Sequence, residues 1–372
     1  MVRCTSVAHY YLQDELVVNT PSPRLIRDLG EQGLLRRLQR FCPPGMVGDD
    51  AALLSVASGL LLVVTEDVLV DGVHFSVGLA SPGVVTTAPD DVGWRAAAAN
   101  LSDLAAMGAS PLGITVGLGL PGELPIAWVE EFYAGLTECL NQYDTVVAGG
   151  DICRSPTLTV AIAAFGQVPP DRVIRRSTAQ PGDAILVTGI HGASRAGLEL
   201  LLHPEQRNEL TEGDRSLLIR AHQRPNPRLD VISALWQHQE SSPTVEQTQT
   251  AVETSPHPPR ITGMDSSDGL ADAVLQICRA SSVGATLDRQ RIPMFPALTN
   301  WISTSQAMDW ALYGGEDFEL VLCMPPDLAQ QVQQQLPGAA IVGTITAGSE
   351  VVLSDTCGKT VLSLEQGFQH FS

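Results

Sequence analysis

Two hydrophobic periods recur along the chain, and together they predict a mixed α/β protein. Apolar residues spaced three and four apart, as on one face of a helix, occur in residues 24–41, 91–107, 126–141, 194–202, 205–228 and 271–279 and from residue 326 onward. Apolar runs bounded by glycine, proline or aspartate predict strands at residues 60–65, 113–120, 145–148, 158–168, 184–189, 285–288, 318–324 and 340–345 and near residue 361. Strands that alternate with long helices are typical of α/β domains.

The same pattern divides the chain into two domains. Its 372 residues are enough for two separate cores. Each half carries strands, long helices and Gly-Asp turns, which predicts two domains of similar build over residues 24–168 and 169–372. Residues 1–23 show no clear period and are predicted to be a flexible N-terminal extension. Residues 239–259 are rich in Ser, Thr, Gln and Pro, which predicts a flexible surface insertion without catalytic residues.

Composition excludes several classes of protein. A hydrophobic content of 44% and a charged content of 17% indicate a globular chain. The net charge of −19, without a basic stripe, argues against a nucleic-acid partner. The seven cysteines are scattered and never spaced C-x-x-C, as expected of a reduced cytoplasmic protein without structural zinc. No apolar run reaches the ~18 residues of a membrane helix, and the N-terminus lacks a secretion signal.

The most informative stretch is residues 264–272, where three aspartates, two serines and a glycine precede a predicted helix. Asp268 or Ser267 is predicted to cap that helix. Backbone N–H groups at a helix start attract anions, whereas aspartates repel them unless a cation lies between. Carboxylate oxygens beside such amides suggest Mg²⁺ and a nucleotide. Taken alone, the stretch favours an ordinary capping turn over a metal site, and the rest of the chain changes that balance.

Similar acidic turns recur beside apolar runs and small residues. They contain Asp49-Asp50, Asp67 and Asp71, Asp103, Asp151, Asp265 and Asp268, and Glu316-Asp317. Ligands of α/β sheets bind at strand ends, and carboxylates that converge there repel one another unless several Mg²⁺ ions lie among them. Such ions supply the charge neutralisation that phosphoryl transfer requires. Asn100 and Asp103 share one face of an Ala-rich helix, where a metal, a substrate or an ordinary polar contact could satisfy them.

Other chemistries are poorly supported. The chain has no nucleophile motif of the serine-hydrolase, zinc-protease or cysteine-histidine kind. Gly117, Gly119 and Gly122 match a dinucleotide-binding spacing, but the first two fall inside a predicted strand. The segment 358–360 resembles the end of a phosphate-binding loop but lacks its earlier glycine. ATP, if bound, is therefore held by other residues.

Taken in order, the acidic motifs resemble those of the thiamine-monophosphate kinase family. The resemblance covers residues 24–372 except the insertion, and it rests on residues 48–54, 65–67, 100–108, 149–151, 265–270 and 314–320. Two of these motifs, Asn-Leu-Ser-Asp-Leu-Ala-Ala-Met-Gly and Gly-Gly-Glu-Asp-Phe-Glu-Leu, are very specific. The wider superfamily, which includes aminoimidazole ribonucleotide synthetase and selenophosphate synthetase, does not share the full set.

The resemblance implies a fold and an activity. The fold would be the two-domain aminoimidazole ribonucleotide synthetase-like one, with a C-terminal α/β domain and with N-terminal sheets that pair in a homodimer near the active site. The activity would be transfer of the γ-phosphoryl group from ATP to thiamine monophosphate, the last step of thiamine diphosphate biosynthesis, with several Mg²⁺ ions.

The resemblance also implies roles for particular residues. The metal positions are Asp50, Thr65, Glu66, Asp67, Asp103, Asp151, Asp265 and Asp268, of which Asp151 and Asp268 are expected to be essential to catalysis. The ATP positions are Gly150, Asp151, Arg176 and Ser267, and the substrate positions are His74, Glu316 and Phe368. Glu316 could face the thiazolium cation, Phe368 could stack on a ring of thiamine, and Arg176 would offset phosphate charge. Glu66 departs from the family pattern, which often has a small or hydroxyl residue there.

Two alternatives predict different sequences. Selenophosphate chemistry would need a reactive cysteine in a glycine-rich loop, and neither Cys4 nor Cys42 lies in one. A regulator without activity would have lost metal ligands, yet all the expected carboxylates are present.

Overall fold

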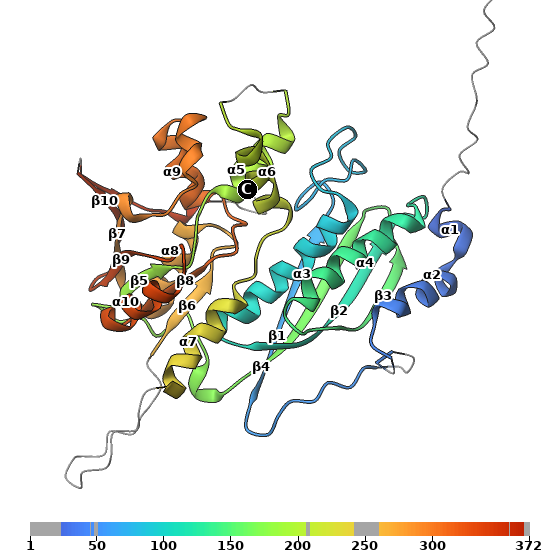
Figure 1. Ribbon diagram of the computed structural model, residues 1–372, viewed down its shortest axis with the longest axis horizontal. Helices are drawn as coiled ribbons and strands as arrows, with labels where there is room; N and C mark the ends of the chain where they lie inside the picture. Colours follow the sequence, from blue (N-terminus) through green and yellow to red (C-terminus); the bar gives the residue numbers. More distant parts are fainter. Residues whose placement is uncertain are drawn as a thin grey trace, which may run out of the picture.

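The computed structural model describes residues 24–44, 46–47, 51–205, 209–241, 260–356 and 358–367, which form two sheets with their helices (Figure 1). The predicted extension at residues 1–23 lies outside these ranges, and so do residues 242–259 of the predicted insertion. Residues 239–241, which were assigned to that insertion, are instead the last residues of α7 (Leu229–Ser241). Within the described ranges, no helix has both the length and the apolar character needed to cross a bilayer.

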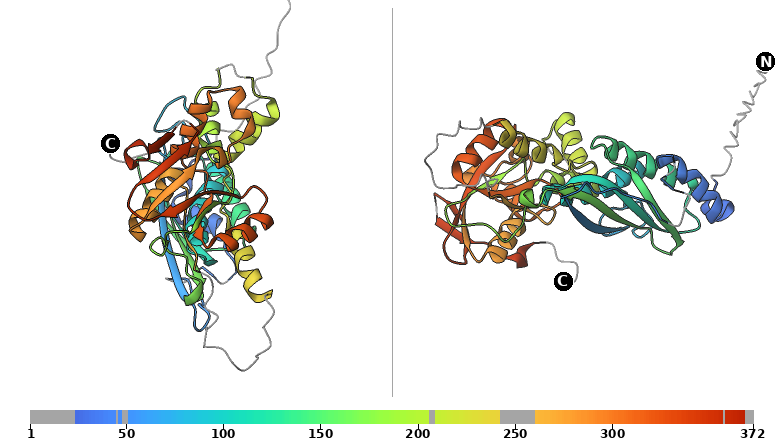
Figure 2. Two further views of the ribbon diagram at one scale, coloured as in Figure 1. Left: turned by 90° about the vertical axis from the view of Figure 1, so that its left-hand side faces the viewer. Right: turned by 90° about the horizontal axis from the view of Figure 1, so that it is seen from below.

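The N-terminal sheet has four strands in the order β1-β4-β2-β3. They are β1 (Leu61–Val70), β2 (Ser110–Leu120), β3 (Val147–Arg154) and β4 (Thr159–Val168). β4 is antiparallel to both β1 and β2, and β3 is parallel to β2. Helices α3 (Pro89–Ala106) and α4 (Ile126–Asn141) lie on one face of this sheet (Figure 2, right). The sheet therefore has one helix-covered face and one open face, and β1 and β3 are its two edges.

Helix α3 is the central element of this layer because small residues let it approach its neighbours closely. Ala96, Ala97 and Ala98 are fully buried. A Cβ atom added to Gly93 would lie 1.9 Å from the carbonyl oxygen of Phe132 in α4, well inside van der Waals contact. The spacing between α3 and α4 is thus set by the absence of a side chain.

The C-terminal sheet has seven strands in the order β11-β10-β7-β9-β5-β8-β6. They are β5 (Ala184–Val187), β6 (Thr262–Asp265), β7 (Gly284–Asp288), β8 (Leu320–Met324), β9 (Ala340–Thr346), β10 (Val351–Asp355) and β11 (Gly358–Val361). Helices α8 (Leu270–Ser281) and α9 (Thr304–Tyr313) pack on one face of it, and α7 and α10 (Pro326–Gln335) pack on the other. Helices α5 (Ala193–Leu202) and α6 (Glu212–Gln223) form a third group beside α9.

The two domains share apolar contacts and polar links. One hydrophobic cluster runs from α3 and the N-terminal sheet through α7 to the inner face of the C-terminal sheet. The segment after α6 crosses α3, where Trp94 Nε1 donates to the carbonyl of Pro225 at 2.8 Å. Arg224 in the same segment pairs with Asp90 and Asp91 at the start of α3. The relative position of the two domains is therefore fixed by packing as well as by the covalent link.

Two strands are longer than their sequence pattern predicted, and this changes the position of candidate site residues. β1 pairs with β4 without interruption from Leu61 to Val70, so Glu66 and Asp67 lie inside the strand instead of at its end. β3 continues to Arg154 because residues 149–154 pair with β2, which places Gly150 and Asp151 within the strand. Cross-strand pairing thus overrides the polar and glycine signals that normally end a strand.

Several helices and strands also differ from those that the sequence pattern predicts. The single helix over residues 24–41 is divided into α1 (Ile26–Leu29) and α2 (Glu31–Leu38), because Gly30 adopts φ +72°. Helix α8 begins at Leu270, and its N-cap residue is Gly269 in place of the predicted Ser267 or Asp268, with no side-chain cap. The pattern did not predict α7, α9, β6 or β10. The interpretation of Gly117 and Gly119 as strand residues is confirmed, because both lie in β2.

A glycine substitution tests the close approach of α3 and α4. Gly93→Ala is expected to lower the free energy of unfolding by about 2–4 kcal/mol, because the added methyl group cannot fit without separating the helices. Gly213→Ala, in the more open α6, is the matched control and should change stability by less than about 1 kcal/mol. Urea denaturation of both variants measures the difference, and equal effects would contradict the packing argument.

Candidate active site

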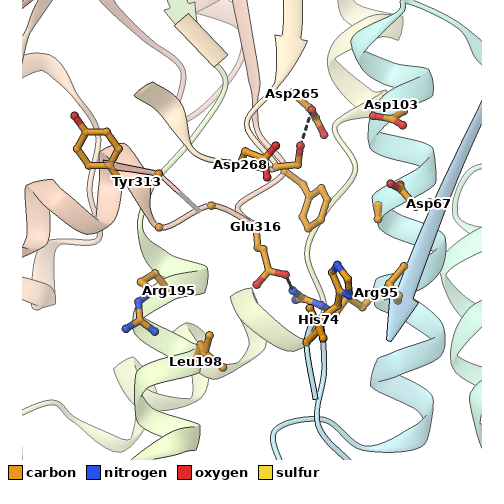
Figure 3. A pocket seen from close by; sticks show the side chains of 18 of the residues that line it. Asp67, His74, Arg95, Asp103, Arg195, Leu198, Asp265, Asp268, Tyr313 and Glu316 are labelled. Atoms are coloured by element: carbon orange, nitrogen blue, oxygen red, sulfur yellow. Dashed lines mark hydrogen bonds and ion pairs between the residues drawn. The ribbon is translucent and has the colours of Figure 1, made fainter. Parts of the chain in front are cut away.

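A pocket of about 1080 Å³ lies where the two domains meet (Figure 3). Its walls come from β1, α3, the end of β6, helices α5 and α9, and the loop between α9 and β8. The polar residues that line it include Glu66, Asp67, His74, Arg95, Asp103, Arg195, Asp265, Ser267, Asp268, Asp309 and Glu316. Most of the residues singled out from the sequence are therefore brought to one place, although they are separated by up to 250 positions along the chain.

One part of the pocket carries four aspartates from three elements: Asp67 from β1, Asp103 from α3, and Asp265 and Asp268 from the end of β6 and the following turn. Asp265 is almost completely buried, and it accepts hydrogen bonds from Ser102 Oγ at 2.8 Å and Ser267 Oγ at 3.0 Å. Thr65 donates to Asp103 at 2.5 Å. These hydroxyls orient the carboxylates from both domains.

The electrostatics of this group favour a cation. Burial, followed by the charges of Asp103 and Asp268, raises the pKa of Asp67 to about 6. Burial and the neighbouring Asp103 raise the pKa of Asp265 to about 7, although Ser102 and Ser267 lower it. The pKa of Asp103 is also raised, mainly by burial. Carboxylates with raised pKa values gain most from a positive charge placed between them.

This donor set fits Mg²⁺ bound together with a phosphate ligand. Among the residues described, no three His, Cys, Asp or Glu side chains are spaced to hold an ion by themselves. Mg²⁺ does not require such a cage, because it is commonly bound by one or two carboxylates, water molecules and substrate phosphates. The hard oxygen ligands and their mutual repulsion therefore fit that ion in an open arrangement.

The three candidate metal residues of β1 lie on alternate faces of the strand. Thr65 lies on the α3 side of the sheet, since it contacts Asp103, and Asp67 follows it on the same side. Glu66 points to the opposite, open face, although it still lies at the edge of the pocket. Glu66 is thus set apart from its two neighbours by the pleat of the strand.

The other part of the pocket is built around Glu316. Its backbone is left-handed, with φ +60°, and its N–H donates to the carbonyl of Ser267 at 2.6 Å. The close approach needs Gly315, where a Cβ atom would lie 2.7 Å from that same carbonyl oxygen. Burial raises the pKa of Glu316, but the charge of Arg95 and its hydrogen bond to the carboxylate outweigh that effect, so the net pKa is lowered. The result is an ionised carboxylate in a pocket that Trp310, Tyr313 and Phe318 also line.

His74 and Arg176 also lie near these groups. His74 lines the pocket, and its Nδ1 accepts a hydrogen bond from the N–H of Val70 at 3.1 Å. Burial raises the pKa of Asp103, and the charge of Arg176 offsets part of that rise, so the guanidinium lies close enough to act on the aspartates. Asn100, in contrast, is buried in the helix layer, where its amide donates to Ala96. It therefore does not join Asp103 in the pocket.

Gly150 and Asp151 are not part of this pocket. They line a second one of about 490 Å³ beside β3, together with apolar residues of α2 and with Met46, Val47, Ala51 and Ala52. Asp151 pairs across the sheet with Gly117, then Ala161, then Val68 of β1. Three strand spacings of ~4.8 Å put it about 14 Å from that position of β1. Within one chain, the candidate ATP residues are thus divided between two pockets.

The structure also adds residues that sequence reasoning missed. Arg95, Arg195, Trp310 and Tyr313 line the main pocket. Arg95 had a usable signal, because it lies four residues before Ala99 and eight before Asp103, on the same face of one helix. The others lie on helices with no visible link to the acidic motifs. Asp50 and Phe368 lie outside the described residues.

Comparison with known proteins agrees with this architecture. Residues 48–168 match the N-terminal domain of AIR synthase related proteins, and residues 180–356 match their C-terminal domain. The thiamine-monophosphate kinase of Synechococcus elongatus is 51% identical over 352 residues, which are 94% of this chain and 99% of that protein. The crystal structure of thiamine-monophosphate kinase from Stenotrophomonas maltophilia K279a has a TM-score of 0.69 and 33% identity, covering 86% of this chain and 93% of that one. The structure of AaThiL complexed with AMPPCP and TMP has a TM-score of 0.64 and 27% identity, covering 92% and 100%.

The raised pKa of Asp265 predicts a pH dependence of stability. Because its folded pKa of about 7 lies above the ordinary value, the folded state binds a proton that the unfolded chain releases, and stability is lost as the pH rises through this range. Asp265→Asn cannot ionise. In EDTA, we therefore compare the free energy of unfolding of Asp265→Asn with that of the unmodified protein. The difference, variant minus unmodified, should be larger at pH 7.5 than at pH 4.5. Urea unfolding at both pH values measures this, and a difference that does not change with pH would contradict it.

Proposed function

This chain belongs to the thiamine-monophosphate kinase family of AIR synthase related proteins, and from that premise we propose that it phosphorylates thiamine monophosphate with ATP, giving thiamine diphosphate and ADP. It is then a phosphotransferase with a phosphate group as acceptor, and it performs the last step of thiamine diphosphate biosynthesis. The observation that carries the proposal is the composition of the main pocket, which is lined by four aspartates, by the ionised Glu316 and by the aromatic residues Trp310, Tyr313 and Phe318. A substrate with an anionic phosphate and a cationic ring matches these groups.

The proposed residue roles follow this arrangement. Metal ligands are proposed at Thr65, Glu66, Asp67, Asp103, Asp151, Asp265 and Asp268, and ATP contacts at Gly150, Asp151, Arg176 and Ser267. His74 and Glu316 are proposed to contact thiamine monophosphate. Roles for Asp50 as a metal ligand and for Phe368 as a ring contact rest on the family resemblance alone.

The chemistry requires positioning more than bond-making groups. The attacking phosphate oxygen of thiamine monophosphate is already anionic near neutral pH, so no general base is needed. Mg²⁺, when bound, would neutralise the phosphates and polarise the transferred group. The aspartates fix where that neutralisation occurs, Arg176 adds positive charge near Asp103, and Glu316 orients the ring.

A homodimer is proposed because the N-terminal sheet leaves an apolar face uncovered. Leu62, Val64 and Val68 are each about half exposed on the face of β1 opposite α3. An apolar surface of this kind marks an interaction site. A second copy packed there would cover it, and it could place β3 of one subunit beside β1 of the other. The partner subunit's Asp151 would then lie beside β1, where Glu66 points to that same face, and the two pockets would adjoin around one ATP molecule.

Two further expectations belong to the same proposal. The division into residues 24–168 and 169–372 is supported by the end of β4 at Val168 and by the limits of the two family matches. A cytoplasmic location is supported by the cysteines at positions 42, 139, 153, 278 and 323, each of which is free.

Product analysis tests the reaction itself. Purified protein with ATP, Mg²⁺ and thiamine monophosphate should form thiamine diphosphate and ADP in equal amounts, and EDTA should abolish both. Free thiamine in place of thiamine monophosphate is the control and should give no product. A folded protein that forms no thiamine diphosphate would refute the proposed substrate.

A pair of variants tests whether two subunits build one site. Asp151→Asn and Asp268→Asn should each lower kcat at least ~100-fold while leaving the fold intact, because each removes a proposed metal ligand. When the two variants are co-expressed in equal amounts, about half of the dimers are mixed, and each mixed dimer has one of its two sites with both aspartates. About a quarter of the normal activity should therefore return. No regain would place both residues in a site made by one chain, and near-normal turnover of either single variant would remove that residue from the mechanism.

A further inference from the structure

Arg95 is a fully buried arginine that reaches the substrate part of the pocket from the N-terminal domain. It lies on α3, one and two turns before Ala99 and Asp103, and only 1% of its surface is exposed. All three residues line the pocket. A buried guanidinium is unfavourable unless its N–H groups and its charge are both satisfied. The partners of Arg95 therefore indicate what it does.

Those partners lie in the C-terminal half of the chain. Nη1 donates to the carbonyl oxygen of His222, and Nη2 forms an ion pair with Oε1 of Glu316 (Figure 3). The second oxygen of Glu316, Oε2, lies 3.7 Å from Nδ1 of His222. Burial lowers the pKa of His222 to about 3, so this imidazole is neutral and does not compete as a cation. The ion pair with Arg95 is thus made through Oε1, whereas Oε2 is the oxygen nearer to His222.

The loop that carries Glu316 needs such a contact. Gly315, Glu316 and Phe318 all have positive φ values, and for the two non-glycine residues this backbone is unfavourable. Asp317 holds the same loop from the other side, because its carboxylate accepts the N–H groups of Gly192 at 2.7 Å and Ser194 at 2.9 Å. Strained backbone persists only where the surroundings determine it. The ion pair with Arg95 is the contact that fixes the Glu316 side chain itself.

We propose that Arg95 is a positioning residue for substrate binding, which holds the Glu316 carboxylate so that Oε2 faces the cationic or N–H-donating ring of the substrate. The inference rests on the proposed function. It assigns Arg95 an effect on the binding of thiamine monophosphate and none on ATP, because its contacts are to Glu316 and His222 and not to the four aspartates.

Two other roles would predict different results. A purely structural link between the domains would lower stability without a selective effect on one substrate. A guanidinium that binds the substrate phosphate directly would act independently of Glu316. The structural role is tested by comparing KM for thiamine monophosphate with KM for ATP. Direct binding of the phosphate is tested by a double-mutant cycle of Arg95 and Glu316.

The experiment measures steady-state kinetics for both substrates in Arg95→Met, Glu316→Gln and the double variant. Each single change should raise KM for thiamine monophosphate ~10–100-fold and leave KM for ATP within about 2-fold. KM for thiamine monophosphate in the double variant should be at most about 3-fold higher than in the single variant with the higher KM, because both changes remove the same contact. Multiplied effects in the double variant, or equal increases in both KM values, would overturn the proposal.

Arg224→Met is the matched control. Arg224 also joins the C-terminal half to α3, through Asp90 and Asp91, but it does not line the pocket. It should lower the thermal midpoint and leave KM for thiamine monophosphate unchanged. A KM increase as large as that of Arg95→Met would show that any loss of an interdomain arginine has this effect, and the specific role would be rejected.

Arg95→Lys decides the question if Arg95→Met does not fold. Lysine keeps the charge but cannot hold Glu316 and the His222 carbonyl with one planar group. KM for thiamine monophosphate should rise ~3–10-fold with KM for ATP unchanged, and no rise at all would overturn the inference. The unmodified protein is assayed in parallel. If it forms no thiamine diphosphate, the proposed function fails. If it turns over normally and the Arg95 variants have the same KM values, only the role of Arg95 is refuted.

Discussion

Repulsion between buried carboxylates is the constraint on which the rest of this structure depends. Asp67, Asp103 and Asp265 come from three different elements, and burial raises the pKa of each. The charges of neighbouring aspartates raise the pKa values of Asp67 and Asp265 further. A folded protein keeps such a group only if other contacts compensate for it. Here the compensation comes from hydroxyl donors such as Ser102 and Thr65 and from the extensive packing between the domains. The same unfavourable charge makes the pocket a strong attractor for cations and for the phosphates that accompany them.

Helix α3 connects this electrostatic problem to the fold. Its small residues set the close approach to α4, while Trp94 and Arg95 reach into the C-terminal half of the chain. Asp103 then lies at the point where both domains contribute to the pocket. Because one rigid helix carries packing, domain contact and a candidate ligand, the geometry of the site is determined by the same interactions that stabilise the domain. This explains how groups from distant parts of the chain can be held in a fixed arrangement before any ligand binds.

The two parts of the pocket differ in how their charge is balanced. The aspartates have no buried arginine among them in the contacts described, and they would be neutralised by an incoming cation. Glu316 instead has a permanent partner in Arg95 and a lowered pKa. One part is therefore arranged to change its charge state on binding, and the other keeps its charge throughout. This difference fits a ligand with a phosphate group that needs metal and a ring that needs orientation.

The sequence by itself determined the fold class, the family resemblance and most of the residues that meet in the pocket, because hydrophobic periods and short acidic motifs are local features. Helix α4 was predicted with its observed bounds for that reason. Only the tertiary structure decided that Glu66 and Asp67 lie inside a strand and on opposite faces, since this depends on pairing with β4, almost a hundred residues away. It also decided that Asp151 lies in a second pocket, and that Arg95 contacts Glu316, which is more than 200 residues distant. Such contacts leave no periodic signal along the chain, because they arise from the packing of one domain against the other.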